Sequence, residues 1–226
     1  MSRPLKETIT CPKCGHKGEA VIWSSLNNVL SPDAAAELLF GNLFGYTCPE
    51  CENTTELCYA CLYHDMEKHA MVQYVPDESQ AEATVAHLDG FLDGDIPHHE
   101  MDECGYRYRI VFEHNRLREK ARIFHDGLDD RVIETLKLMV ETVASENAEG
   151  MGDTPVYYDS IKDDGSLVFV LLADEVMVAT IPRPAYDELT PEPVESLDRD
   201  YFIDRNWAIA NYSTMLGSQK MRLACS

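Results

Sequence analysis

Hydrophobic residues in the first third of the chain occur in short runs with the two-residue period that is typical of β-strands. These runs occupy residues 17–28, 55–64 and 69–75. Between the first two runs, Ser31-Pro32 is a typical helix start, and Leu38, Leu39 and Leu43 would form the apolar face of that helix. The pattern predicts a small sheet into which a helix is inserted.

The second half of the chain has a longer hydrophobic period and then returns to strands. From Val132 to Val143, apolar residues recur at i, i+1, i+4, i+7, i+8 and i+11, which predicts an amphipathic helix that starts at Asp129 or Asp130. Further helices are expected at residues 116–125 and 203–216. Strands are expected at residues 106–112, 156–161, 167–172 and 176–181, the last three as an antiparallel meander.

An acidic stretch separates these halves. Residues 77–105 hold nine acidic residues and no lysine or arginine, and part of the stretch has helical hydrophobic spacing before the expected loop at residues 93–99. We place a boundary here, which gives a first domain at residues 1–100 and a second at residues 105–226.

Four cysteines form two copies of one motif, Cys11-Pro12-Lys13-Cys14 and Cys48-Pro49-Glu50-Cys51. Two residues between the cysteines let both sulfurs reach one ion, and zinc takes four thiolates tetrahedrally. Gly15 follows the first motif and can adopt positive φ, whereas Glu52 holds the equivalent place in the second. The spacing predicts one structural zinc ion per chain, with iron in a rubredoxin-like centre as the chemical alternative.

The expected fold class is therefore α+β. A zinc-ribbon-like N-terminal domain with a helical insert is followed by an α+β domain with a small antiparallel sheet.

Other residues of metal-binding type are expected to have structural roles. Cys58, Cys61, His64 and His69 could form a second site, but they fall in an expected strand, where residues three apart point to opposite faces. We expect Cys58 and Cys61 not to be ligands. The acidic run around His98-His99 is interpreted as a solvated loop.

The two motifs resemble those of the bacterial CpXC-domain family, as do Cys61-Leu62-Tyr63-His64-Asp65 and Tyr74-Val75-Pro76. The runs 117–120 and 127–133 are also similar to segments of such proteins. The resemblance covers about the first half of the chain. It implies zinc bound through the paired motifs and a bacterial origin, and it implies no reaction. Glu52 and the extra pair Cys58 and Cys61 depart from the family pattern.

Net charge limits the partners of this chain. Nineteen basic and forty acidic residues give a net charge of −21, which repels phosphate backbones and argues against nucleic acid as a partner. No run approaches the ~20 apolar residues that cross a bilayer, and the N-terminus lacks a signal-peptide pattern. Because paired cysteines of metal type suit a reducing compartment, a cytoplasmic location is expected, with no membrane partner.

No catalytic motif is present in the sequence, and a closed four-cysteine site leaves no ligand position for a substrate. We expect a zinc-stabilised scaffold or protein-interaction module that binds another protein or its own copy. The alternative is an enzyme with a cleft between the domains or in the C-terminal half. Convergence of His98, His99 or His125 with a carboxylate would favour that alternative.

Overall fold

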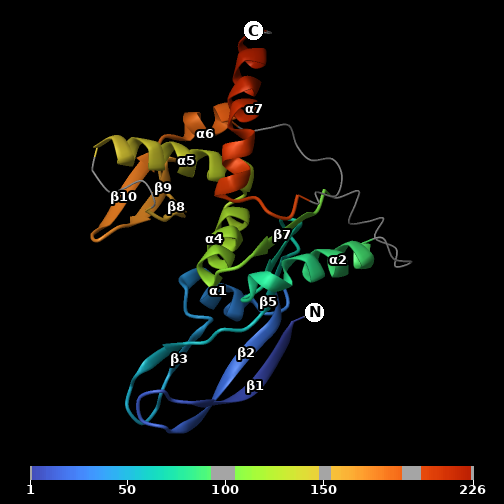
Figure 1. Ribbon diagram of the computed structural model, residues 1–226, viewed down its shortest axis with the longest axis vertical. Coiled ribbons are helices and arrows are strands. Elements are labelled where there is room, and N and C mark those ends of the chain that lie inside the picture. Colours follow the sequence, from blue (N-terminus) through green and yellow to red (C-terminus); the bar gives the residue numbers. More distant parts are fainter. Residues whose placement is uncertain (1, 93–104, 148–153, 190–199, 225–226) are drawn as a thin grey trace. The chain divides into compact units, whose positions relative to one another are not determined.

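The protein contains both helices and small β-sheets, which confirms the predicted α+β class (Figure 1). The computed structural model describes residues 2–92, 105–147, 154–189 and 200–224. The chain divides into two compact units, the first made of residues 1–121 and 195–201 and the second of residues 122–194 and 202–226. Compactness does not measure independent folding, so the domain limits drawn from the sequence stay a prediction.

The first unit is built on a five-stranded sheet with the order β1-β2-β5-β6-β7. Its strands are β1 (Arg3–Thr10), β2 (Lys17–Asn27), β5 (Cys61–Asp65), β6 (Ala70–Tyr74) and β7 (Arg107–Val111). The pairs β1-β2 and β5-β6 are antiparallel, whereas β2-β5 and β6-β7 are parallel. Because β2 pairs with β5 only over its last three residues, most of the β1-β2 hairpin extends beyond the sheet.

A second, two-stranded ribbon in this unit pairs β3 (Gly45–Thr47) with β4 (Thr54–Glu56). The helices of the unit are α1 (Pro32–Phe40), the 3-10 helix η1 (Glu78–Gln80), α2 (Ala81–Leu92) and the first two turns of α4 (His114–His125). Leu26, Tyr63, Val72 and Leu117 are buried in its core. Arg118 of α4 donates to the Leu39 carbonyl at 3.1 Å and so joins α4 to the end of α1.

Two sequence predictions in this unit are corrected. The strand expected at residues 55–64 is two strands, because the segment between β4 and β5 leaves the ladder to pack: the Leu57 amide donates to the Phe44 carbonyl, and the Tyr59 ring packs on Phe44. Leu43 is not part of α1. Gly41 ends the helix at φ +85°, with its amide bonded to Leu38.

The second unit packs helix α5 (Asp130–Asn147) against a three-stranded antiparallel sheet of order β10-β9-β8. Its strands are β8 (Val156–Ile161), β9 (Leu167–Leu172) and β10 (Val176–Ile181), as the meander prediction requires. Val132, Ile133 and Leu136 of α5 are fully buried, and so are Leu167 and Phe169 of β9. Helix α7 (Arg205–Ala224) packs on α5.

Three elements were not expected from the sequence in their observed form. Strand β1 has only Leu5 and Ile9 as apolar markers among charged residues. Helix α6 (Arg183–Leu189) was not expected because it is short and contains proline, but Pro184 lies in its first turn, where proline is tolerated. Strand β7, placed in the second domain by the sequence analysis, pairs with β6 in the first sheet.

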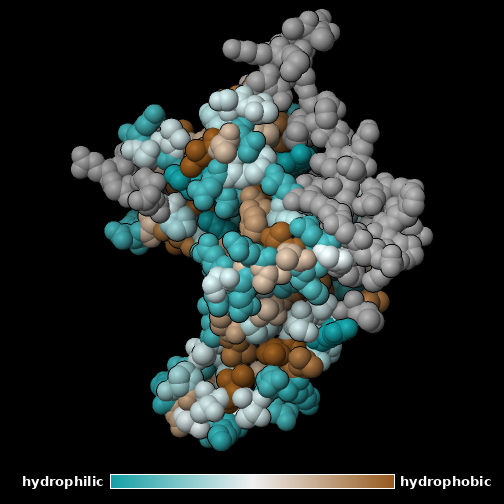
Figure 2. All heavy atoms as spheres, turned by 45° about the vertical axis from the view of Figure 1, so that its right-hand side comes forward, coloured by the Kyte–Doolittle hydropathy of each residue, from teal (hydrophilic) through white to brown (hydrophobic). Residues whose placement is uncertain are grey.

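Hydrophilic residues predominate on the face shown in Figure 2, and hydrophobic ones reach the surface in small groups. Single exposed apolar residues are normal in soluble proteins, so only a continuous apolar surface calls for an explanation. Among the described residues, no helix combines the length and apolar character needed to cross a bilayer.

Candidate metal centre

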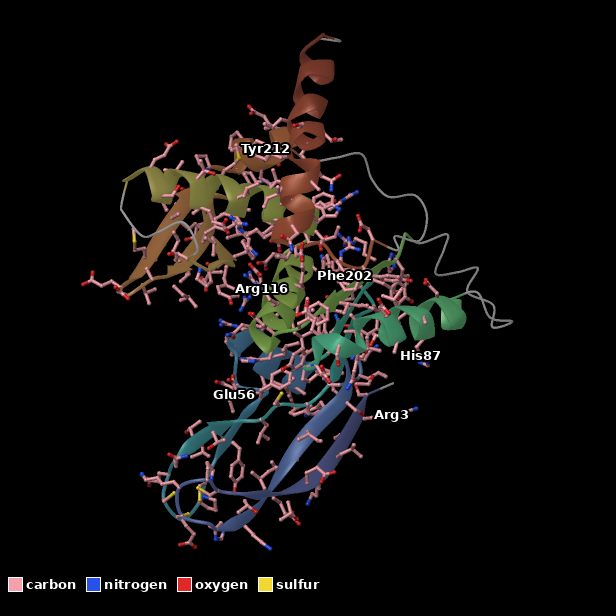
Figure 3. All side chains as sticks on the ribbon, viewed as in Figure 1. Arg3, Glu56, His87, Arg116, Phe202 and Tyr212 are labelled. Carbon is pink, nitrogen blue, oxygen red and sulfur yellow. The ribbon has the colours of Figure 1, made fainter. Side chains whose placement is uncertain are left out.

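Each CPxC motif connects two antiparallel strands at the same kind of turn. The first joins β1 to β2 beyond the paired residues Thr10 and Lys17, and the second joins β3 to β4 beyond Thr47 and Thr54. Sulfur atoms gather at the end of the hairpin formed by β1 and β2, as the yellow sticks in Figure 3 show. The two ribbons therefore meet at their turns.

The two turns have the same backbone hydrogen bonds. The Gly15 amide donates to the Cys11 carbonyl, and the Glu52 amide donates to the Cys48 carbonyl, each at 2.9 Å. Gly15 has φ +76°, and Glu52 reaches the same left-handed region at φ +56°. Because a side chain disfavours this conformation, the second turn forms in spite of its local preference rather than because of it.

The four sulfurs form a compact cluster with the dimensions of a metal site. All four Sγ atoms lie within 4.8 Å of one another, and the pairs Cys11–Cys51 and Cys14–Cys48 are 3.7 and 3.6 Å apart. A tetrahedral zinc site with Zn–S bonds of about 2.3 Å has sulfurs about 3.8 Å apart, whereas a disulfide requires about 2.05 Å. The distances fit four ligands around one ion, and all four cysteines are free thiols.

Negative charges on neighbouring sulfurs repel one another, and a cation bound between them would reduce this repulsion. The backbone amide of Cys14 donates to the Cys11 sulfur and lowers the pKa of that thiol to about 6. The pKa of Cys14 is raised: the His16 amide favours its thiolate, but the Cys51 sulfur and burial outweigh that effect. Negative charge on one sulfur therefore opposes ionisation of its neighbours, and a bound cation would offset that repulsion.

A small apolar cluster supports the sulfurs from one side. Cys11, Tyr46 and Cys48 are buried together, with Ile9 and Leu57 packed against them. Ile9 and Tyr46 each lie two residues before the first cysteine of a motif, which places them on the same strand face as that cysteine. Alternation along the strand is the sequence signal that could have identified Tyr46 as part of the site.

The Tyr46 side chain leaves no room for a side chain at Gly18 of β2. A Cβ atom added to Gly18 would lie 2.1 Å from the Tyr46 hydroxyl oxygen, so β2 needs glycine at this point. Among the described atoms that hydroxyl is buried without a hydrogen-bond partner. Burial, and then the negative charge on the four cysteines, raises its pKa. The ring therefore serves as packing for the sulfur cluster.

The other cysteines and histidines of metal-binding type do not join this cluster. Within the described ranges, the four motif cysteines form the one group of three or more potential ligands close enough for a metal. Cys61 is fully buried in β5 with its pKa raised to about 12 by burial, whereas Cys58 is exposed and lies 3.7 Å from the Tyr74 hydroxyl. His64 bonds to Tyr106, and His69 stacks on the same ring.

Histidines suggested for the enzyme alternative do not form a site in the described part of the chain. His98 and His99 lie outside the described residues, and His125 is exposed at the end of α4. A polar network at the far end of β2, where the buried Asn27 bonds to His64, was not expected from the sequence. No sequence pattern marks that network, because its members are brought together by strand pairing.

A model of one protein family matches this chain. The family is described as CpXC protein, and the match covers residues 9–137, which is more than half of the chain and includes both motifs. No curated protein and no solved structure is similar enough to count as a match. The chain belongs to the CpXC family.

Proposed function

We propose that this CpXC protein binds one zinc ion per chain through Cys11, Cys14, Cys48 and Cys51, and that the ion has a structural role. The observation that carries the proposal is the set of four free thiols within 4.8 Å of one another. Four protein ligands complete a tetrahedral sphere and leave no position for water or substrate. The ion would close the β1-β2 and β3-β4 turns onto each other.

Zinc is preferred to iron on the chemistry of the turns. Rubredoxin-like iron sites have a glycine after each motif, and only the first motif here has one. Thiolate tetrahedra of this size suit either metal, so the distances alone do not choose. Metal analysis and the visible spectrum do: zinc gives a colourless protein, whereas ferric thiolate gives a red one.

Metal content per chain tests the ligand assignment. Cys48→Ser should lower bound zinc well below one ion per chain and expose the arm formed by β1 to β4 to protease. Cys61→Ser is the matched control, because both thiols are fully buried and both variants lose the same sulfur. Full zinc content in the Cys48→Ser variant, or equal losses in both variants, would contradict the assignment.

For the whole chain we propose a cytoplasmic interaction module without its own catalysis. The net charge of −21 supports a protein partner or a second copy rather than nucleic acid. The enzyme alternative requires a cleft with convergent ionisable groups. A groove in the second unit, about 460 Å³ in volume, is lined by apolar residues and Thr180 and therefore supports binding more than catalysis.

A further inference from the structure

Strand β10 is an edge strand without the features that protect the other edge strands of the two larger sheets. Edge strands normally carry charges or proline, which prevent unwanted pairing. Strand β1 carries Pro4, Lys6 and Glu7, and β8 carries Asp159. On β7 the Ile110 amide is already bonded to the Tyr201 carbonyl. Strand β10, with the sequence VMVATI, carries neither charge nor proline.

One face of β10 is open to solvent and carries two valines and Thr180, whereas the other face is apolar and partly buried. Val176 and Val178 are 68% and 64% exposed on one face. Met177, Ala179 and Ile181 lie on the other face, because they pair with residues of β9 whose side chains are buried. An edge strand with this composition is a template for another strand.

The second of these faces continues into a groove beside α5. Met139 and Val143 of α5 line it with Leu171, Met177 and Ile181 of the sheet, and its volume is about 460 Å³. Val143 is itself 58% exposed. A strand added beyond β10 would therefore gain backbone hydrogen bonds at the edge and an apolar surface for alternate side chains.

We propose that the added strand is β10 of a second copy of this chain, paired antiparallel across a two-fold axis. The two sheets would then form one continuous six-stranded sheet, with both copies of α5 on the same face. The proposal rests on the interaction function proposed above and names its partner. A two-fold interface is formed by the same surface on both copies, so that surface must be complementary to itself. An uncharged strand paired antiparallel with its own copy satisfies this condition.

Charges at the two ends of β10 favour this occupant and this direction. Asp174 and Glu175 precede the strand, whereas Arg183 follows it. Antiparallel pairing brings the acidic end of each copy to the basic end of the other, and parallel pairing would bring like charges together. Lys162, whose Nζ lies 3.0 Å from the Thr180 hydroxyl oxygen, belongs with Asp163 and Asp164 to the turn before β9, one strand further from the edge.

Strand geometry also selects a register. If the two-fold axis passes at Ala179, Met177 of each copy lies opposite Ile181 of the other, and the two groove faces stay on one side of the sheet. Glu175 then lies opposite Arg183 of the second copy. Arg183 already bonds Asp187 at 2.8 Å, and its guanidinium would be shared between the two carboxylates.

Light scattering on the full zinc-loaded chain, in reductant and at physiological ionic strength, tests the interface. We expect a concentration-dependent dimer. Val178→Lys should raise the dimer Kd by about 100-fold or more, because the two-fold axis introduces the lysine twice. Val29→Lys is the matched control, since Val29 is similarly exposed at 53% and lies in the first unit. That variant should dimerise like the wild type.

Charge reversal tests the direction of pairing even if Val178→Lys disturbs the fold. Glu175→Lys and Arg183→Glu should each weaken the dimer, and the double variant should recover at least about 10-fold over the weaker single variant. Arg183 also lies over the Tyr186 ring at 4.7 Å, so the coupling between the two changes, not the single loss, is the readout.

Three outcomes would overturn the inference: a monomer at about 100 μM, a dimer with the same Kd after Val178→Lys, or charge effects that simply add. A monomer whose groove binds an apolar dye would instead assign the groove to a small ligand and would equally overturn it. Zinc content measured on the same samples separates this from the metal proposal. A zinc-loaded monomer would contradict the dimer alone, and a metal-free dimer would contradict the zinc site alone.

Discussion

The two ends of strand β2 are held in place by different kinds of chemistry. At Lys17 the strand leaves the first CPxC turn, where residues are mostly exposed and the buried cluster is limited to Cys11, Tyr46 and Cys48. At Asn27 the strand enters the five-stranded sheet, where Leu26 and Asn27 are buried and β5 lies alongside. One end depends on four sulfurs, and the other on packing and directed hydrogen bonds.

The hydrogen bonds at the Asn27 end determine one another. The Asn27 side-chain oxygen accepts from the Val29 and Leu30 amides at 3.0 Å, which directs the amide nitrogen at His64 Nδ1. Nδ1 must then accept, so the proton of the neutral ring lies on Nε2 and is donated to the Tyr106 hydroxyl at 3.0 Å. The hydrogen bonds of this end are made within the chain, whereas at the sulfur end the proposed ion would neutralise the thiolates.

The largest expected effect follows from metal removal. Structural zinc contributes an apparent ~10–16 kcal/mol in small fingers, so a chelator should unfold the part of the β1 to β4 arm next to the four cysteines while the Asn27 end of β2 stays folded. Limited trypsin digestion should then cut at Lys13 and Lys17. The resistant fragment should begin at or near Gly18, because Leu26, Tyr63 and Val72 still form a core.

The domain limits drawn from the sequence predict a different product from the same digestion. If residues 1–100 fold as one metal-dependent domain, the resistant fragment begins near residue 105. That result would refute the contrast between the two ends of β2, since β2, β5 and β6 would be lost together. The zinc-loaded chain, digested in parallel, is the control.

A second, smaller effect is expected from overpacking the sulfur end. Gly18→Ala places a methyl group 2.1 Å from the Tyr46 hydroxyl and should lower the free energy of unfolding by about 1–3 kcal/mol. Tyr46→Phe removes a buried hydroxyl without a described partner, so we expect it to be neutral or stabilising by about 1 kcal/mol.

The double variant with both changes measures the contact between Gly18 and Tyr46. It should recover part of the loss, because the nearest ring carbon, Cζ, would still lie 3.2 Å from the new methyl group. Denaturant unfolding of the zinc-loaded proteins gives all three values. If the two changes in the free energy of unfolding are additive, the new methyl group does not press on the Tyr46 hydroxyl, and the sulfur end is less tightly packed than described.

A third effect concerns the Asn27 end and appears as a dependence on pH. Burial lowers the pKa of His64 below its ordinary value, so the unfolded chain binds this proton more readily than the folded one. The free energy of unfolding should therefore fall as pH drops through about 6.5. Well above that pH, His64 is neutral in both states and should not make stability depend on pH. Protonation would also set an N–H at Nδ1 against the Asn27 amide.

Replacement of His64 separates this effect from acid release of metal. Between pH 7.5 and 6, His64→Gln should have a smaller slope of unfolding free energy against pH than the wild type. His87→Gln, at an exposed position on α2, should keep the wild-type slope. Equal slopes in the three proteins would show that His64 does not sense pH, and zinc content is checked at each pH.

The sequence was sufficient where chemistry is local and insufficient where it depends on long-range pairing. Spacing within each motif predicted that Cys11, Cys14, Cys48 and Cys51 lie together, and the 3.6-residue period predicted α5, because each signal is contained in a short segment of the sequence. The partnership of Asn27, His64 and Tyr106 spans about eighty residues and arises only when β2, β5 and β7 enter one sheet.

Strands β1 and β7 illustrate the same limit in two ways. Strand β1 has many charged side chains because almost all of its residues are exposed, so its apolar alternation is weak. Strand β7 was identified as a strand, but its pairing with β6 was not expected, since no property of Arg107–Val111 specifies β6 as its neighbour. Parallel pairing across a long connection leaves no local sequence signal.

The smallest expected effect compares the two CPxC turns directly. Glu52 holds the left-handed conformation, with φ +56°, that glycine adopts without cost in the first turn. Glu52→Gly should therefore stabilise the zinc-bound arm by up to about 1 kcal/mol, after the added freedom of the unfolded chain is subtracted. Gly15→Ala should destabilise it by about 1 kcal/mol through backbone strain alone, because a Cβ there meets no atom within 4 Å.

Zinc affinity, measured by competition with a chelator, is the most sensitive readout, since 1 kcal/mol is about a fivefold change in Kd. Glu52→Ala is the control that separates backbone from charge: it removes the carboxylate but keeps a Cβ in the strained conformation. Affinity should rise for Glu52→Gly and much less for Glu52→Ala. If both variants gain equally, repulsion between the carboxylate and the thiolates, and not the φ angle, distinguishes the second turn from the first.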